Sequence, residues 1–309
     1  MLSFYEHIID DVLGEKISKS NATTVFHFTS VSALYSMIKT HSLRLTNSMY
    51  LNDRNEFADF LHSMCDTVRN LIDTEQDEQI KNNYKILLEE YKKALERNEQ
   101  KHTDYYYHAS YFIFSASEYD NSIPMWNYYS QSSGICIEFD LHQLRNFFEY
   151  CIKDCGESIF VDYKCIYEKE EKYNILRTYI IERIKEMQPH FWKSALKYSY
   201  AFKDEIFKYE RETRFVIRLD KKYFEEQCNF DKEEKQITKN LSLGFYNTND
   251  TIRPVIKLRG NKQLPIKRVI ISPFNETETL YSGLKRFLDF HGYSKVIVDT
   301  VETSMRRDF

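Results

Sequence analysis

The sequence predicts an α+β protein with a mixed, strongly twisted sheet at its core and a helical hairpin inserted into it. Short runs of β-branched and aromatic residues, such as residues 23–29, are separated by amphipathic helical stretches in irregular order. Residues 56–103 hold two successive helical patterns whose outward positions are mostly charged or amide side chains. We therefore expect one domain over residues 1–309, with residues 56–103 as the helical hairpin insertion.

The scarcity of glycine excludes several nucleotide-binding and hydrolase folds. Only 7 of the 309 residues are glycine, and no two of them lie within four residues of each other. The dinucleotide-binding and P-loop motifs need clustered glycines to bring backbone N–H groups onto phosphate. The Gly-x-Ser-x-Gly turn of the α/β-hydrolases needs a glycine pair as well.

The first half of the chain alternates helices and strands. A serine, Ser30 or Ser32, can cap the helix that follows the first predicted strand, and Val31, Leu34 and Ile38 form its apolar stripe. A proline, Pro124, stands in the tolerated first turn of a short helix that includes Trp126. We expect helices at 3–13, 31–40, 56–73, 76–100 and 124–129, strands at 23–29, 43–46 and 106–117, and a turn with a helix cap at 51–53.

The second half contains the strand on which the functional interpretation depends. From Tyr209 onward, residues alternate so that Glu210, Glu212 and Arg214 share one face of a strand, and Phe215 lies on the other face, toward a core. Residues 220–250 show no clear period and are expected to be a long connection. We further expect strands at 134–140, 159–167, 252–258, 267–272 and 295–299, and helices from about 141 to 151, at 168–200 with an interruption at Pro189, and at 276–290.

Charge and hydropathy limit the class of protein. The net charge of −4 argues against binding nucleic acid chiefly by neutralising phosphate. The sequence contains no run of about 18 apolar residues, which is the length needed to cross a bilayer, and no recognisable signal peptide. The six cysteines are scattered, without a CxxC pair, so we expect reduced thiols, no bound metal and a cytoplasmic location.

Two inward-facing polar groups are candidates for chemistry. The first is the Glu210, Glu212 and Arg214 set, which is either a structural ion-pair ladder or a catalytic carboxylate with tuning neighbours. The second is His27 with Thr29, where the histidine is either a hydrogen-bonded core residue or a ligand-binding group.

Several segments in this order resemble the bacterial DUF2971 family. They include Phe26-His-Phe-Thr-Ser30, the Leu51-Asn-Asp53 turn and Pro124-Met-Trp-Asn-Tyr-Tyr129. The later ones are Gly134 to Phe139, Lys203, Tyr209-Glu-Arg-Glu-Thr-Arg214, Val269 to Pro273, and Ser304 with Arg306. The resemblance covers roughly residues 24–306 outside the hairpin and the 220–250 segment.

The order of a His-x-Thr strand, a short helix and a strand also resembles the first module of the ADP-ribosyltransferases. That likeness implies an ADP-ribosyltransferase-like sheet and NAD as cofactor. His27 and Thr29 would then hold NAD, Glu212 would be the catalytic glutamate, and Glu210 would assist it. The choice between the two glutamates stays open.

The same resemblance implies a wider NAD site. Arg44 would contact the phosphates, Tyr111 or Ser115 would supply the middle-strand residue, and Trp126 is one of the aromatic residues that could stack on nicotinamide. Glu210 and Arg214 would set the ionisation of Glu212 by charge pairing.

The expectation is an NAD-dependent ADP-ribosyltransferase-like enzyme that modifies a protein or a nucleic acid. A bacterial toxin or anti-phage effector, with an antitoxin or defence-system partner, fits a composition poor in glycine and rich in tyrosine, lysine and asparagine. Two alternatives stay open. One is a non-enzymatic module that senses a nucleotide, and the other is a metal-dependent nuclease using Asp53, Glu56, Glu210 and Glu212.

Overall fold

The computed structural model of the chain describes residues 12–51, 56–99, 110–130, 133–185, 195–220, 222–225, 234–248, 251–275 and 277–301. Residue contacts divide the chain into two compact units. The helical unit comprises residues 1–20, 51–109 and 163–208, and the sheet unit comprises residues 21–50, 110–162 and 209–309. The α+β class is confirmed, whereas a single domain with an inserted hairpin stays a prediction.

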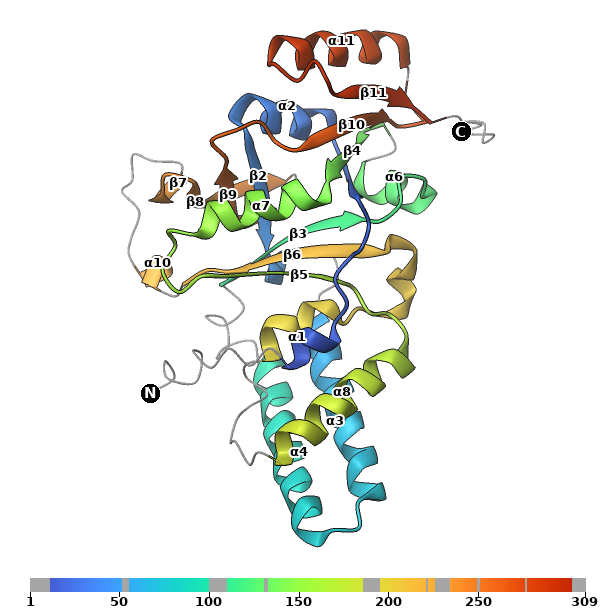
Figure 1. Cartoon of the computed structure of the whole chain (residues 1–309), viewed down its shortest axis with the longest axis vertical. Coiled ribbons are helices and arrows are strands. Elements are labelled where there is room, and N and C mark those ends of the chain that lie inside the picture. Colours follow the sequence, from blue (N-terminus) through green and yellow to red (C-terminus); the bar gives the residue numbers. More distant parts are fainter. Residues whose placement is uncertain are drawn as a thin grey trace. The chain divides into compact units, whose positions relative to one another are not determined.

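The helical unit is built around two neighbouring helices, α3 (Glu56–Thr74) and α4 (Glu78–Glu99), which form a hairpin (Figure 1). Asp77 caps α4 by accepting the backbone N–H groups of Gln79 and Ile80 at 2.8 and 3.1 Å. The helix α8 (Lys169–Lys185) packs against both. The other elements here are α1 (Val12–Lys16) and the 3₁₀ helix η2 (Leu196–Ala201). In the described part of the chain, no helix has the length and apolar character needed to cross a membrane.

The sheet unit holds a mixed, mostly antiparallel sheet, in which β10 and β11 pair in parallel. Its strands are β1 (Thr24–Thr29), β2 (Ser42–Asn47), β3 (Tyr111–Ser117), β4 (Ile135–Asp140), β5 (Ile159–Lys164), β6 (Glu212–Arg218), β7 (Glu234–Thr238), β8 (Leu241–Thr248), β9 (Thr251–Arg259), β10 (Ile266–Ile271) and β11 (Ile297–Thr300). Its helices are α2 (Val31–Thr40), α6 (Ile123–Tyr129), α7 (Leu141–Ile152), α10 (Lys222–Glu225) and α11 (Thr277–Phe290), with the 3₁₀ helix η1 (Ser48–Tyr50). The strand β5 and the 3₁₀ helix η3 (Glu205–Glu210) each contain residues of both units.

The strand β3 is the branch point of the sheet. One edge of β3 pairs with β6 along its whole length, and β6 pairs in turn with β5 (Figure 1). The other edge is shared, because β1 pairs only at Phe26↔Ser117, whereas β2 pairs at Thr46↔Ile113 and Asn47↔Phe112. From β1 the sheet continues through β4 and β10 to β11. From β2 it continues through β9 and β8 to β7.

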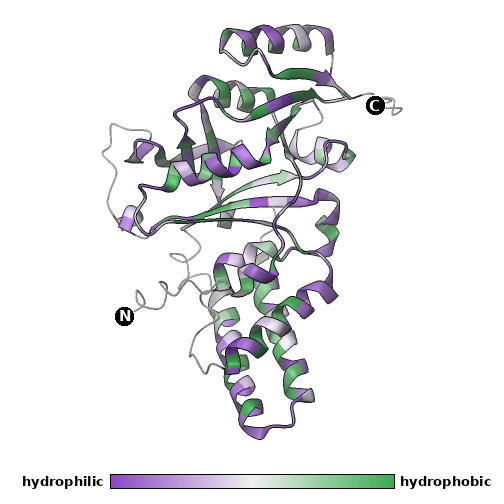
Figure 2. Ribbon diagram, viewed as in Figure 1, coloured by the Kyte–Doolittle hydropathy of each residue, from purple (hydrophilic) through white to green (hydrophobic). Residues whose placement is uncertain are grey.

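The register gives the sheet two distinct faces. The core face carries Val25, Phe114 and Phe215, which join the largest apolar cluster with side chains from α2, α7 and α11. In α7, hydrophobic and hydrophilic residues alternate along the helix (Figure 2), as expected for a helix that lies on a sheet. The opposite face, which we call the carboxylate face, carries Phe26 and Glu212 and is packed by α6.

Most predicted elements are confirmed, including the capping of α2, where Ser30 accepts the N–H of Ala33 at 3.1 Å. Two predictions are wrong. The strand expected from Tyr209 begins at Glu212, because residues 205–210 form η3. The 220–250 connection contains β7 and β8. The β7 strand was missed because it is polar and lies at the edge of the sheet, so it shows no apolar alternation.

One other prediction is confirmed only in part, and others fall outside the described residues. Of the helix expected over 168–200, residues 169–185 form α8 and residues 196–201 are 3₁₀ helix, whereas the expected interruption at Pro189 lies outside the described residues. The residues 3–11 of the first predicted helix, Asn52 and Asp53, and Ser304 with Arg306 lie outside the described residues.

Candidate functional site

Two glutamates flank a strained residue where η3 passes into β6. Glu210 ends η3 and Glu212 begins β6, and the side chains are 0% and 5% exposed. Between them Arg211 has φ of 44°, a left-handed conformation that is unfavourable for a residue with a Cβ. Arg211 is held there by two contacts. Its carbonyl accepts the N–H of Glu118 at 3.0 Å, and its exposed guanidinium lies 4.1 Å from the centre of the Tyr119 ring. Such strain often marks a functional site.

Glu212 forms a buried ion pair with Arg214, two residues along the same strand. The Nε atom and a terminal nitrogen of Arg214 each lie 2.8 Å from Oε2 of Glu212. Arg214 is only 2% exposed, so both charges are removed from bulk water. A buried, charge-assisted pair of this kind fixes the direction of the carboxylate.

Glu210 is held by a different element. The hydroxyl of Tyr129, the last residue of α6, donates to Oε1 of Glu210 at 2.6 Å. One turn earlier in α6, Trp126 is fully buried and packs edge-on against Phe28 of β1, with ring centres 4.9 Å apart. α6 therefore fixes Glu210 from the carboxylate face. We call Glu210, Arg211, Glu212, Arg214 and Tyr129 the carboxylate cluster.

A row of facing residues leads across five strands to this cluster. Arg268 of β10 faces Glu138 of β4, which faces Phe26 of β1, then Ser117 of β3, and finally Glu212 of β6. Residues paired in this way point to the same side of a sheet. Arg268 also donates to Glu138 at 2.7 Å. The carboxylate face is thus charged at both ends of the row and carries phenylalanine and serine between them.

His27 lies on the other side of the sheet. It follows Phe26, so its side chain points to the core face, where its ring stacks on Phe114 at a centroid distance of 4.5 Å. Its Nδ1 donates to the carbonyl of Ser115 at 2.9 Å. This bond lies next to Phe26↔Ser117, the one position at which β1 pairs with β3 among the described residues. The register therefore does not bring His27 and Glu212 to one cleft. The geometry is that of a half-buried, hydrogen-bonded structural histidine.

Burial lowers the pKa of His27, and the hydrogen bond to the Ser115 carbonyl opposes this only in part. Above the ordinary pKa of about 6.5, both folded and unfolded chains are neutral at this position. As the pH falls below that value, the unfolded chain binds a proton that the folded chain resists, so stability is lost. We expect His27→Asn, which keeps an N–H donor, to flatten the loss of stability between pH 6.5 and 5. Urea midpoints at several pH values measure this.

The control for this prediction is His142→Asn, at an exposed position of α7. It should leave the pH dependence as it is in the parent chain. If the urea midpoint of His27→Asn falls with decreasing pH as steeply as that of the parent chain, the imidazole of His27 is equally easy to protonate in the folded and unfolded chains.

The other predicted ligand-binding residues fall into three groups. Thr29 shares the face of His27 by strand alternation. Tyr111 and Ser115 of β3 face the carboxylate side, where Ser115 lies opposite Arg214. Arg44 of β2 stacks 4.0 Å from the ring centre of Tyr246 in β8, beyond the last residue at which β2 pairs with β3.

The sequence also makes Asp53, Glu56, Glu210 and Glu212 candidate metal ligands. In the described ranges no three His, Cys, Asp or Glu side chains are grouped so that they could hold a metal ion. Asp53 and the side chain of Glu56 lie outside those ranges.

Comparison with known proteins gives one match. Residues 125–215 match the DUF2971 family model. The family is described as a protein of unknown function. No curated protein and no solved structure gave a significant match. The comparisons do not support the resemblance to ADP-ribosyltransferases, which stays an expectation.

The DUF2971 segment begins in α6 and ends in β6. It therefore contains every member of the carboxylate cluster, whereas His27, Thr29, Arg44, Tyr111 and Ser115 lie outside it. Two members were missed from the sequence. Tyr129 is 81 residues from Glu210, and nothing local signals that pairing. Arg211 shows no sign of its left-handed backbone, because arginine has no preference for that conformation.

Proposed function

We propose that the carboxylate face binds NAD and that the protein is an NAD-dependent ADP-ribosyltransferase-like enzyme. The observation that carries this proposal is the carboxylate cluster: two buried glutamates on either side of a strained arginine, one held by Tyr129 and the other by Arg214. The acceptor would be a protein or a nucleic acid. A role as a bacterial toxin or anti-phage effector belongs to the same proposal.

The proposed reaction breaks the bond between nicotinamide and ribose. Nicotinamide leaves with the bonding electrons, the acceptor forms a bond to the anomeric carbon of the ribose, and the acceptor loses a proton. Positive charge develops on the ribose, as in glycoside cleavage, and a fixed carboxylate stabilises it. Glu212 is the better candidate for this role. Glu210 is fully buried and bonded to Tyr129, so it would support the turn.

The residues around the cluster fit part of a nucleotide. Arg211, the residue between the two glutamates in the sequence, has an exposed side chain whose guanidinium could meet the pyrophosphate of NAD. Tyr119, which stacks on Arg211, is exposed and offers a ring for stacking a base. Trp126 fits less well, since its ring is already covered. NAD, when bound, supplies the leaving group and the ribose, whereas the chain supplies charge and position.

A second candidate is a non-enzymatic module that senses a nucleotide. The burial of both carboxylates favours it, since groups 0% and 5% exposed serve better to hold a structure than to meet a substrate. In that case Arg211 and Tyr119 would bind the ligand without turnover.

The decisive experiment measures nicotinamide release and transfer of labelled ADP-ribose from NAD into cell extract. We expect Glu212→Gln to lower the rate by about 10²–10³, since this removes positioned charge from the reacting ribose. His27→Asn, on the opposite face, is the matched control and should keep the rate within a few-fold. Thermal unfolding of each variant checks that it is folded.

The other outcomes decide between the candidates. A rate that survives Glu212→Gln but is lost in His27→Asn would place the chemistry on the core face. A rise in melting temperature with NAD, abolished by Arg211→Gln and without nicotinamide release, would favour the sensing module. Neither release nor a thermal shift would reject NAD as the ligand.

A further inference from the structure

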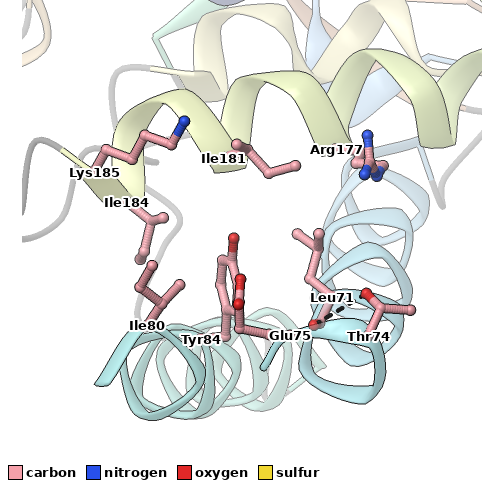
Figure 3. A pocket seen from close by; sticks show the side chains of 9 residues that line it. All are labelled: Leu71, Thr74, Glu75, Ile80, Tyr84, Arg177, Ile181, Ile184 and Lys185. Atoms are coloured by element: carbon pink, nitrogen blue, oxygen red, sulfur yellow. Dashed lines mark hydrogen bonds between the residues drawn. The ribbon is translucent and has the colours of Figure 1, made fainter. Parts of the chain in front are cut away.

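A cavity of about 380 Å³ opens inside the helical unit between α3, α4 and α8 (Figure 3). Its volume lies in the range of small-molecule sites. None of its lining residues belongs to the carboxylate cluster, and it plays no part in the function proposed above. The lining residues are Leu71, Thr74 and Glu75 at the end of α3, Ile80 and Tyr84 in α4, and Arg177, Ile181, Ile184 and Lys185 in α8.

The lining separates into an apolar part and a basic part. Four aliphatic side chains, from Leu71, Ile80, Ile181 and Ile184, form the apolar surface. Arg177 and Lys185, two turns apart on α8, add two positive charges. Both cations are exposed, and neither forms an ion pair with any described residue. Two unpaired cations beside an aliphatic surface suit a ligand that is apolar at one end and anionic at the other.

Tyr84 supplies a hydroxyl that is open to this cavity. The residue as a whole is only 2% exposed, and its hydroxyl makes no hydrogen bond to any described residue but is not itself among the fully buried polar atoms. In Figure 3 the hydroxyl points from α4 into the space below α8. A hydroxyl that faces a cavity and has no protein partner is available to donate to a ligand. Burial and then the charge of Glu75 raise the pKa of Tyr84, which keeps the phenol protonated and able to donate.

The two remaining polar groups of the lining are already engaged. One carboxylate oxygen of Glu75 accepts the backbone N–H groups of Gln76 and Asp77 at 2.8 and 3.0 Å. The hydroxyl of Thr74 donates to the carbonyl of Asn70 at 3.0 Å. With one anion and two cations in the lining, the cavity suits a ligand with a single negative charge.

We propose that this cavity binds a small amphipathic carboxylate of the medium-chain fatty-acid class. The alkyl chain lies against Leu71, Ile80, Ile181 and Ile184. The carboxylate accepts from the Tyr84 hydroxyl and is attracted by Arg177 and Lys185. The site belongs to the helical unit alone and is independent of the proposed NAD chemistry.

Decanoate is the probe that tests the proposal, by isothermal titration calorimetry with the full-length chain. We expect saturable binding to one site, and about tenfold weaker binding in Arg177→Gln/Lys185→Gln, which corresponds to about 1.4 kcal/mol. Tyr84→Phe, which removes only the hydroxyl, should weaken binding about fivefold. Raising the salt concentration should weaken binding in the parent chain but hardly in the double variant.

Three controls make the test specific. Lys169→Gln removes an exposed charge elsewhere on α8 and should leave the affinity unchanged. Decanol, without the charge, should bind about tenfold more weakly than decanoate. Ile181→Trp should fill the cavity and abolish binding. Absence of saturable binding at 1:1 stoichiometry (to about 1 mM, a weak-binding limit), or equal affinity in the parent and in the charge and Tyr84 variants, would overturn the proposal.

Discussion

Replacing Arg214 with methionine is expected to lower the free energy of unfolding by about 3–5 kcal/mol, because Glu212 would stay buried without its arginine. The pair is held by two contacts of 2.8 Å, and the side chains are 2% and 5% exposed, so water replaces the lost partner poorly. Urea unfolding followed by tryptophan fluorescence measures the change. A Trp192→Phe background leaves Trp126, on the carboxylate face, as the sole reporter.

Two further variants show whether the loss comes from the buried charge. Arg214→Met/Glu212→Leu removes both charges and should recover much of the stability. Lys92→Gln breaks the exposed Lys92–Glu89 pair and should change stability by less than about 1 kcal/mol. If Arg214→Met costs no more than Lys92→Gln, the Glu212–Arg214 pair does not contribute as a buried interaction.

The elements that could be predicted from the sequence are those whose pattern is local. Alternation in Thr24–Thr29 and in Glu212–Arg218 shows which residues turn inward, and both strands form with that alternation. Ser30 could be recognised as a helix cap from its position alone. The strand β8 also carried a signal, with Leu241, Leu243 and Phe245 on one side, but the polar residues around it concealed the pattern.

The candidate site was harder to predict because it depends on which face of the sheet each strand presents. Alternation indicated that Glu212 and Arg214 share a face and that His27 and Thr29 share a face. It could not show that these are opposite faces, because that follows from the single pairing Phe26↔Ser117 between β1 and β3. Shifting such a pairing by one residue would exchange the faces. No local pattern fixes that register.

The carboxylate cluster also depends on the aromatic core behind it. The ring of Phe215, the residue after Arg214, stacks on Phe148 of α7 at a centroid distance of 5.0 Å and lies edge-on to Phe114 at 6.0 Å. Phe114 in turn stacks on His27. The core face thus positions both β3 and β6. Loosening it should disturb the Glu212–Arg214 pair on the other side of the same strand.

We expect Phe215→Ala to cost about 3–5 kcal/mol, because it removes buried aromatic surface and leaves a cavity that fixed neighbours cannot fill. Phe215→Leu keeps more of the volume and should cost clearly less. Phe290→Ala is the exposed control, since that side chain is 85% exposed, and should change stability by less than about 0.5 kcal/mol. Urea midpoints compare the three variants. Equal midpoints for Phe215→Ala and Phe290→Ala would mean that the aromatic cluster does not support β6, and the carboxylate cluster would then be fixed by η3 and α6 alone.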